Sequence, residues 1–202
     1  MSPRKTHSWK KFVSATKNRK PVSFIGQASA ILNNRGLAVD LGCGAGVDAR
    51  HLAELGFKVI AVDNDPAAIQ STKTLCAEVP VKVKRMDMVK FPLPHQQVDL
   101  VIAWNSLPFL RKKFMKRILR TIQAALVPGG LFVFSLFGPD DAWAKTRKDM
   151  SFISPTELQQ CLRQTSFIDL RESRREGPDV AGQIKFWHRV QGIGQKAKEK
   201  RC

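Results

Sequence analysis

Short, mostly apolar runs alternate along this chain with segments whose apolar residues recur at helical spacing. The strands predicted from this pattern are Leu37–Leu41, Val59–Val62, Val81–Arg85, Val98–Trp104 and Leu131–Leu136. Most of them are nearly continuous in apolar residues, which is typical of strands covered on both faces. Two later segments, 167–170 and 185–191, are further strand candidates.

Proline and glycine mark where the helices between these strands begin and end. The helices are expected to open at Pro21, Val47, Pro66, Arg111 and Pro155. Asp65 stands directly before Pro66, and a side chain in that position can cap a helix whose first residue needs no N–H. Gly56 is expected to stop the second helix, and the sequence from Pro128 to Gly130 predicts a turn before the fifth strand.

Strands and helices that alternate in this way build a parallel sheet with helices on both faces and right-handed crossovers. We therefore expect an α/β fold with a doubly wound, mostly parallel sheet. The chain has 202 residues, which is enough for one domain with a full core. The domain is expected over residues 21–192. A basic N-terminal segment, 1–20, is a candidate lid, and residues 193–202 form a basic tail.

The net charge of +17 is distributed unevenly along the chain. Residues 1–20 hold seven basic and no acidic side chains, residues 21–109 are balanced, and residues 110–202 hold 19 basic against nine acidic side chains. Such flanks bind polyanions in some proteins and are a solvated surface in others. No RNA-binding motif with interleaved aromatic residues accompanies them.

The cysteines and the apolar runs indicate a reduced, cytoplasmic protein. Cys43, Cys76, Cys161 and Cys202 are too widely spaced for a zinc motif or a dense disulfide framework. The longest apolar run, from Leu131 to Phe137, is much shorter than a membrane span of ~18 residues. The N-terminus has no apolar stretch of the kind that a signal peptide contains.

A glycine-rich turn follows the first predicted strand. Gly42, Gly44 and Gly46 are spaced as GxGxG, and Val47 stands where a dinucleotide fingerprint would need glycine. In doubly wound sheets, ligands bind at the carboxyl ends of the strands beside this first turn. Asp63 closes the second strand, where a carboxylate can accept from both hydroxyls of a ribose. The pattern therefore predicts a nucleoside-type ligand.

The order of five motifs resembles the class I S-adenosylmethionine-dependent methyltransferases. They are Val39–Gly46, Val59–Asp63, Met86-Asp87, Val98–Ile102 and Leu126–Gly130. The resemblance covers roughly residues 36–136 and implies a Rossmann-like sheet of seven strands, with S-adenosyl-L-methionine as cofactor and S-adenosyl-L-homocysteine as product.

The resemblance also implies roles for individual residues. The glycine loop would hold the methionine part of the cofactor, with Asp40 near its amino group. Asp63 would bind the ribose, Asn64 would lie against the adenine, Asp87 would accept from the adenine amino group, and Met88 would stack nearby. The expected cofactor residues are Asp40, Gly42, Cys43, Gly44, Gly46, Asp63, Asn64, Asp87, Met88, Trp104 and Asn105. Cys43 is expected to be a small residue lining the loop, because no histidine partner is evident.

The C-terminal part is similar to bacterial small-molecule methyltransferases of the tellurite-resistance-like group. The similar segments are Ser106–Phe109, Phe137–Trp143, Met150–Ile153 and Gly182–His188. In that group an N-terminal segment with a tryptophan, here Trp9 to Pro21, packs near the cofactor entrance. The residues after His188 depart from the group's apolar last strand, and we expect a weak strand there.

Methyl transfer from a sulfonium is an in-line displacement, so orientation of the reactants and exclusion of water can supply most of the catalysis. A base is optional, and His188, Trp143 and Asp141 are its weak candidates. No metal is expected, because no ligand cluster is evident. Asn105 invites comparison with the Asn-Pro-Pro-aromatic motif of amino-group methyltransferases, but Asn105-Ser-Leu-Pro-Phe109 departs from that motif at two positions.

Three functions remain open at this point. The first is methyl transfer to a small-molecule or metalloid-type acceptor. The second is methylation of RNA or of a ribosomal protein, which the basic flanks would suit. The third is a binding or effector protein that keeps the fold without turnover. A small-molecule partner is favoured over nucleic acid, and no membrane partner is expected.

Overall fold

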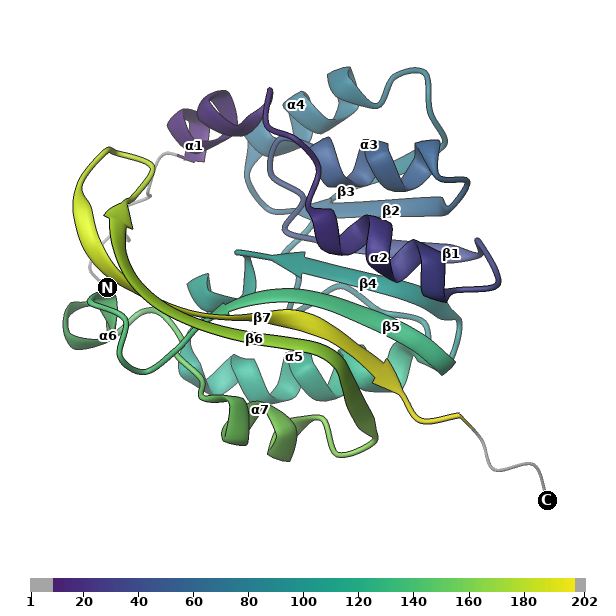
Figure 1. The fold of residues 1–202 in the computed structure, drawn as a ribbon. Helices are drawn as coiled ribbons and strands as arrows, with labels where there is room; N and C mark the ends of the chain where they lie inside the picture. Colours follow the sequence, from purple (N-terminus) through teal and green to yellow (C-terminus); the bar gives the residue numbers. More distant parts are fainter. Residues whose placement is uncertain (1–8, 199–202) are drawn as a thin grey trace.

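The computed structural model describes residues 9–198, which form one seven-stranded sheet with helices on both faces (Figure 1). The strands lie in the order β3-β2-β1-β4-β5-β7-β6. Five of them run parallel: β1 (Leu37–Leu41), β2 (Lys58–Asp63), β3 (Val81–Arg85), β4 (Val98–Trp104) and β5 (Leu126–Phe137). The order reverses between β1 and β4, so the carboxyl ends of these two strands flank the switch point where ligands bind in such sheets.

Helices cover the sheet in two layers, which Figure 1 shows above and below the strands. The helices are α1 (Trp9–Thr16), α2 (Ser23–Ile31), α3 (Val47–Glu54), α4 (Pro66–Leu75), a 3-10 turn (Leu107–Phe109), α5 (Lys112–Ala125), α6 (Trp143–Thr146) and α7 (Pro155–Cys161). One core cluster joins α2 and α3 to one sheet face, and a second joins α5 and α7 to the other. None of the helices within residues 9–198 is long and apolar enough to cross a membrane.

The alternation of side chains along the strands supplies both cores. In β5, Phe132 and Phe134 pack toward α5, whereas Leu131 and Val133 pack toward α2. All four are at most 1% exposed. Burial of such a side chain contributes roughly 1.5–3 kcal/mol, which explains why the parallel strands are so rich in apolar residues. The doubly wound fold expected from the sequence is confirmed.

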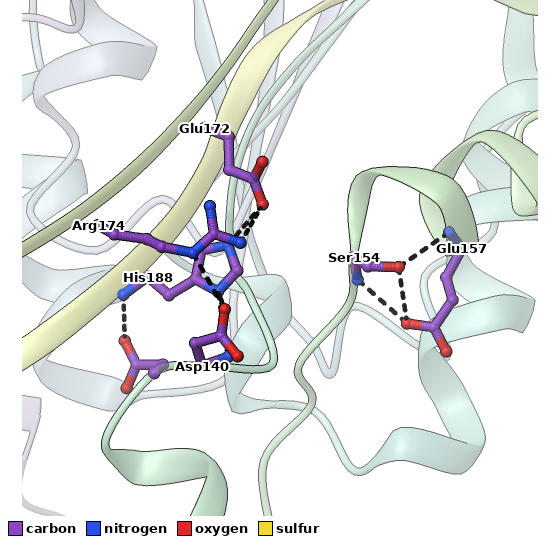
Figure 2. Close-up of polar contacts among 7 residues, drawn as sticks. Asp140, Ser154, Glu157, Glu172, Arg174 and His188 are labelled. Atoms are coloured by element: carbon purple, nitrogen blue, oxygen red, sulfur yellow. Dashed lines mark hydrogen bonds and ion pairs between the residues drawn. The ribbon is translucent and has the colours of Figure 1, made fainter.

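Side chains cap two helix starts, of which the cap by Asp65 was expected from the sequence. The Asp65 carboxylate accepts from the backbone N–H groups of Ala67 and Ala68 at the start of α4. At α7, Ser154 and Glu157 form a reciprocal capping box (Figure 2). Helix α2 differs from expectation, because it begins at Ser23 with Val22 as its cap, two residues after Pro21.

The turn predicted over residues 128–130 is wrong, because these residues belong to β5. The strand begins at Leu126, and its pairing with β4 shifts register between Val98 and Leu100. A Cβ on Gly130 would lie 2.9 Å from the carbonyl oxygen of Val127 and 3.1 Å from that of Val98. The glycine therefore serves a close approach of two backbones inside the sheet rather than a chain reversal.

Strands β6 (Thr165–Pro178) and β7 (Ile184–Lys196) form a long antiparallel hairpin at one edge of the sheet. Both are longer than predicted, and the expected weakness after His188 is wrong. In Gly192 and Gly194, an added Cβ would overlap backbone atoms of Asp169 or approach the Thr165 side chain to 2.7 Å. These glycines let β7 lie against the bulged β6. The sheet thus continues to Lys196, past residue 192, where we expected the domain to end.

Candidate functional site

The glycine loop lies between the end of β1 and the start of α3. Gly42, Gly44 and Gly46 have φ angles of 82°, 55° and 90°, which favour glycine. A Cβ on Gly42 would overlap the Ser106 side chain, and one on Gly46 would lie 2.8 Å from Thr72 Cα. At Gly44, an added Cβ would come within 4 Å of Phe12 alone among residues 9–198. The two outer glycines therefore serve packing, and Gly44 leaves backbone exposed to a ligand.

Asp63 ties this loop to the next helix. Its Oδ2 accepts from the Gly44 N–H at 3.0 Å, and its Oδ1 accepts from the Asp65 N–H at 2.9 Å. Burial raises the pKa of the Asp63 carboxyl above its ordinary value, and the two backbone donors oppose that rise. The carboxylate is held at the carboxyl end of β2 and still faces open space, as a ribose-binding group requires.

A cavity of about 880 Å³ opens at the carboxyl ends of β1, β2 and β4. Eight of the expected cofactor residues line it: Gly42, Gly44, Asp63, Asn64, Asp87, Met88, Trp104 and Asn105. One end carries three carboxylates, those of Asp63, Asp65 and Asp87. On the other side, the segments after β4 and β5 contribute Phe109, Arg111, Phe114 and Arg147, and Trp9 packs on Phe109, whereas Phe12 lies beside Gly44. The cavity therefore has a cofactor-like acidic end and an aromatic, basic end.

Three expected cofactor residues, Asp40, Cys43 and Gly46, are not among the residues that line this cavity. Asp40 is 3% exposed, and its Oδ2 has no hydrogen-bond partner among the described residues. Burial raises the Asp40 pKa well above its ordinary value, and Asp48 adds to the rise while Arg19 opposes it. An orphaned carboxylate oxygen behind the glycine loop is the group that a ligand ammonium could satisfy.

The thiol of Cys43 is buried as well. Its Sγ lies 3.4 Å from the Thr72 hydroxyl, and burial raises the thiol pKa well above its ordinary value. A buried thiol with a raised pKa is a poor nucleophile.

The segment before α2 covers the cavity. Trp9, Phe12 and Val13 of α1 line it, and the Trp9 ring meets the Phe109 ring edge-on at 4.8 Å. The segment is fastened at its far end, where Arg19 forms an ion pair with the buried Asp48 carboxylate. The Val22 N–H donates to the same carboxylate at 3.0 Å. Residues 1–8 of the expected lid lie outside the described residues.

Several lining residues were missed by the sequence analysis. Phe12, Phe114 and Arg147 come from α1, α5 and the end of α6, and no local motif links them. Arg147 forms a bidentate pair with Asp149, which also lines the cavity. The signal that could have found Phe114 is its place one turn into a helix that begins beside the strand end of β4.

The weak candidates for a base lie outside the cavity lining. The Asp141 carboxylate pairs with the Lys185 ammonium and accepts from the backbone N–H groups of Trp143 and His188. The ammonium lies 3.8 Å from the Trp143 ring centroid and 3.6 Å from that of Trp187. Burial lowers the pKa of Lys185. Asp141 and Trp143 thus enclose the protein's own cation.

His188 is fully occupied by protein partners. Its Nδ1 accepts from the Asp140 N–H at 3.0 Å, and its Nε2 lies 2.8 Å from Glu172 Oε1. Arg174 bridges the Asp140 and Glu172 carboxylates, which closes a four-residue network (Figure 2). The hydrogen bond to His188 lowers the pKa of Glu172. In this arrangement neither ring nitrogen of His188 is free to take a substrate proton.

The family comparison agrees with this geometry. The sequence model of the methyltransferase-domain family matches residues 38–130, the part that carries the glycine loop, Asp63 and Asp87. The match covers slightly less than half of the chain, and together with the sheet topology it confirms the resemblance to class I S-adenosylmethionine-dependent methyltransferases noted in the sequence.

Among named relatives, the chain is 32% identical over 123 residues to a carboxy-S-adenosyl-L-methionine synthase of Erwinia tasmaniensis, covering 56% of this chain and 49% of that protein. It is 35% identical over 96 residues to a ubiquinone biosynthesis O-methyltransferase of Methylobacterium sp., covering 46% and 38%. The chain thus spans half or less of these relatives. The structure of TehB from Haemophilus influenzae superposes with a TM-score of 0.76 at 16% identity, over 93% of this chain and 67% of that one, and shares the fold.

Proposed function

We propose that this chain transfers a methyl group from S-adenosylmethionine to a small-molecule acceptor. The observation that carries the proposal is that one cavity is lined both by the glycine loop, Asp63 and Asp87 and by aromatic side chains near the end of β4. When bound, the cofactor supplies an electrophilic methyl group on a sulfonium. The chain's own residues have to bind it, orient it and keep water away.

The acidic end fits this cofactor. In this proposal Asp63 accepts from the ribose hydroxyls and Asp87 accepts from the adenine amino group, and both residues line the cavity. Asp40 offers an unpartnered carboxylate oxygen behind the glycine loop, where the amino group of the methionine part would lie. The carboxylates of Asp63, Asp65 and Asp87 also give this end a negative charge, which favours a cationic sulfonium.

The aromatic end favours a small acceptor. Helix α1 lies over the cavity, and Trp9, Phe109 and Phe114 line that end. Apolar walls exclude water from a displacement that depends on close alignment of donor and acceptor. Since the base candidates are occupied elsewhere, the acceptor is expected to react as a nucleophile that needs little or no proton removal.

A second candidate, methyl transfer to RNA or a ribosomal protein, is favoured by the charge of α5. Its exposed face carries Lys112, Lys113, Lys116, Arg117 and Arg120, and the helix has no acidic residue. This face begins beside the cavity, which Arg111 and Phe114 line. A polyanion could therefore lie along α5 with one group in the cavity.

The experiment that tests the proposal separates the acceptors by size. The protein is incubated with methyl-labelled S-adenosylmethionine and a cell extract divided into small-molecule, RNA and protein fractions. We expect label in the small-molecule fraction. Label in the RNA or protein fraction would support the second candidate, and S-adenosylhomocysteine binding with no label in any fraction would support a binding protein without turnover.

A further inference from the structure

A row of three polar side chains crosses the sheet from β7 through β5 to the end of β4, where Asn105 lines the cavity. Gln191 of β7, Ser135 of β5 and Asn105 after β4 lie on adjacent strands, because Ser135 is in register with Gln191 on one side and with Trp104 on the other. Ser135 is 0% exposed and interrupts the run of Phe132, Val133 and Phe134. A hydroxyl in such a place costs stability unless it is hydrogen-bonded.

The row has a defined direction of donation. The Gln191 Nε2 donates to Ser135 Oγ at 3.1 Å, and Ser135 Oγ donates to Asn105 Oδ1 at 2.6 Å. Because Gln191 already supplies a proton to the hydroxyl oxygen, the hydroxyl proton is free for Asn105. The carbonyl oxygen of the Asn105 amide is thereby turned toward Ser135, away from the cavity.

The backbone of Asn105 has an uncommon conformation. Its φ of 53° lies in the left-handed region, which few residues other than glycine adopt. Its neighbour Ser106 donates to the Leu41 carbonyl and packs against Gly42, so Asn105 lies beside the glycine loop. Within residues 9–198, the Asn105 amide nitrogen makes no hydrogen bond.

We propose that Ser135 and Gln191 are positioning residues. They orient the Asn105 side chain so that its N–H groups face the part of the cavity where the methyl group is transferred. Asn105 then selects an acceptor that offers an oxygen lone pair beside the reacting centre, and it disfavours an acceptor whose amino group needs a hydrogen-bond acceptor there. The inference rests on the proposed function, since it assigns a substrate class to the same cavity.

The selectivity follows from the inventory of the amide. An Asn105 in this orientation offers two donors and no free acceptor directed at the cavity. A ligand N–H or ammonium placed against it would lose a hydrogen bond that it makes in water, whereas an oxygen would keep one. The three side chains thus distinguish a hydrogen-bond acceptor from a hydrogen-bond donor on the ligand, although none of them is ionisable.

Sinefungin tests this directly, because it resembles S-adenosylhomocysteine but carries an amino group where the transferred methyl would be. The measurement is the ratio of its Kd to that of S-adenosylhomocysteine, by calorimetry, for the wild type and for Asn105→Asp, Ser135→Ala and Ser135→Thr. Asn105→Asp replaces the donors with a carboxylate oxygen, so we expect the ratio to fall by about tenfold or more. Ser135→Ala frees the amide to turn, and a fall of roughly two- to fivefold is expected.

Two control variants distinguish a change in the orientation of the Asn105 amide from a general loss of stability or binding. Ser135→Thr keeps the hydroxyl, so its ratio should match the wild type even if its stability is lower. Asp63→Asn weakens both ligands alike and leaves the ratio unchanged. A ratio that is the same in the wild type, Asn105→Asp and Ser135→Ala, with both ligands bound, would overturn the inference. Absence of binding by either ligand to the wild type would instead refute the proposed function.

Discussion

The two halves of the sheet differ in how far their polar side chains are hydrogen-bonded within the protein. Along β1, β2 and β4, carboxylates and amides at the strand ends keep unused hydrogen-bonding capacity, as Asp40 and Asn105 do. Along β6, β7 and the loop after β5, most polar groups pair with one another, as His188, Glu172 and Arg174 do, and among the described residues the buried Arg189 Nε is the exception. A histidine or aspartate near the acceptor end is therefore weaker evidence for catalysis than an unpartnered oxygen beside the glycine loop.

The largest expected effect is a loss of unfolding free energy in the half of the sheet that contains β6 and β7. Asp141→Ala leaves the buried Lys185 ammonium without its ion-pair partner, and removal of one member of a buried pair typically costs about 3–5 kcal/mol of unfolding free energy. Urea unfolding measures the loss. Asp169→Ala, which removes the partly buried partner of the exposed Arg171 on the same hairpin, is the matched control and should change little. A stable Asp141→Ala protein with no methyl transfer would make Asp141 catalytic after all.

Two glycines of the loop allow its role in packing to be separated from its role in ligand binding. Gly42→Ala would force the new Cβ into Ser106, and its positive φ adds about 1–2 kcal/mol of strain, so we expect lower stability. Gly44→Ala suffers comparable strain but meets no close neighbour, and its Cβ would occupy space needed by the ligand. Its loss of S-adenosylhomocysteine affinity should exceed the affinity lost by equally destabilised variants elsewhere. Equal affinities for wild type and Gly44→Ala would contradict the placement of the ligand.

Asp40→Asn should separate stability from binding by moving them in opposite directions. The folded-state pKa of Asp40 is raised, chiefly by burial, so this group stabilises the fold when protonated and loses that contribution as pH rises through the folded pKa. At neutral pH the variant without ligand should unfold at a higher temperature than the wild type and show a smaller loss of stability from acid to neutral pH. Its S-adenosylhomocysteine affinity should fall. If both quantities fell together, Asp40 would be a structural group.

The smallest effect is expected on the basic face of α5. Neutralising Lys112, Lys113 and Lys116 together should leave small-molecule methyl transfer within a few-fold, because isolated surface charges contribute little to a site. Retention on immobilised RNA at two salt concentrations is the decisive measurement. Tight retention in the wild type that salt weakens and the triple variant loses would favour a polyanionic acceptor.

The parallel part of the fold was predictable because its signals are local. Strands buried on both faces are apolar throughout, as in Val98–Trp104, and Asp65-Pro66 caps a helix within its own turn. The hairpin was not, because much of β6 is exposed and charged and owes its extent to pairing with β7. Gly192 and Gly194 look like strand breakers until the backbone of β6 is placed against them.

The residues of the candidate site also differ in whether a local sequence signal predicts them. Asp63 and Asp87 were predictable because Asp63 ends β2 and Asp87 follows β3, so both lie at the carboxyl edge of the parallel strands. Phe12, Phe114 and Arg147 reach the cavity from segments far apart in the chain, so only the folded structure brings them together. For His188 the sequence shows a histidine near an acceptor-side motif, but the partners that occupy both ring nitrogens come from two other segments.

The central claim is that Asp63 binds the ribose of a nucleoside cofactor in this cavity, and calorimetric titration of S-adenosylhomocysteine tests it most directly. We predict binding to the wild type, a loss of about 10- to 100-fold in affinity for Asp63→Asn with the fold intact by circular dichroism, and wild-type affinity for Glu78→Gln, an exposed carboxylate after α4. Wild-type affinity in Asp63→Asn, or no binding by the wild type at millimolar ligand, would contradict the account.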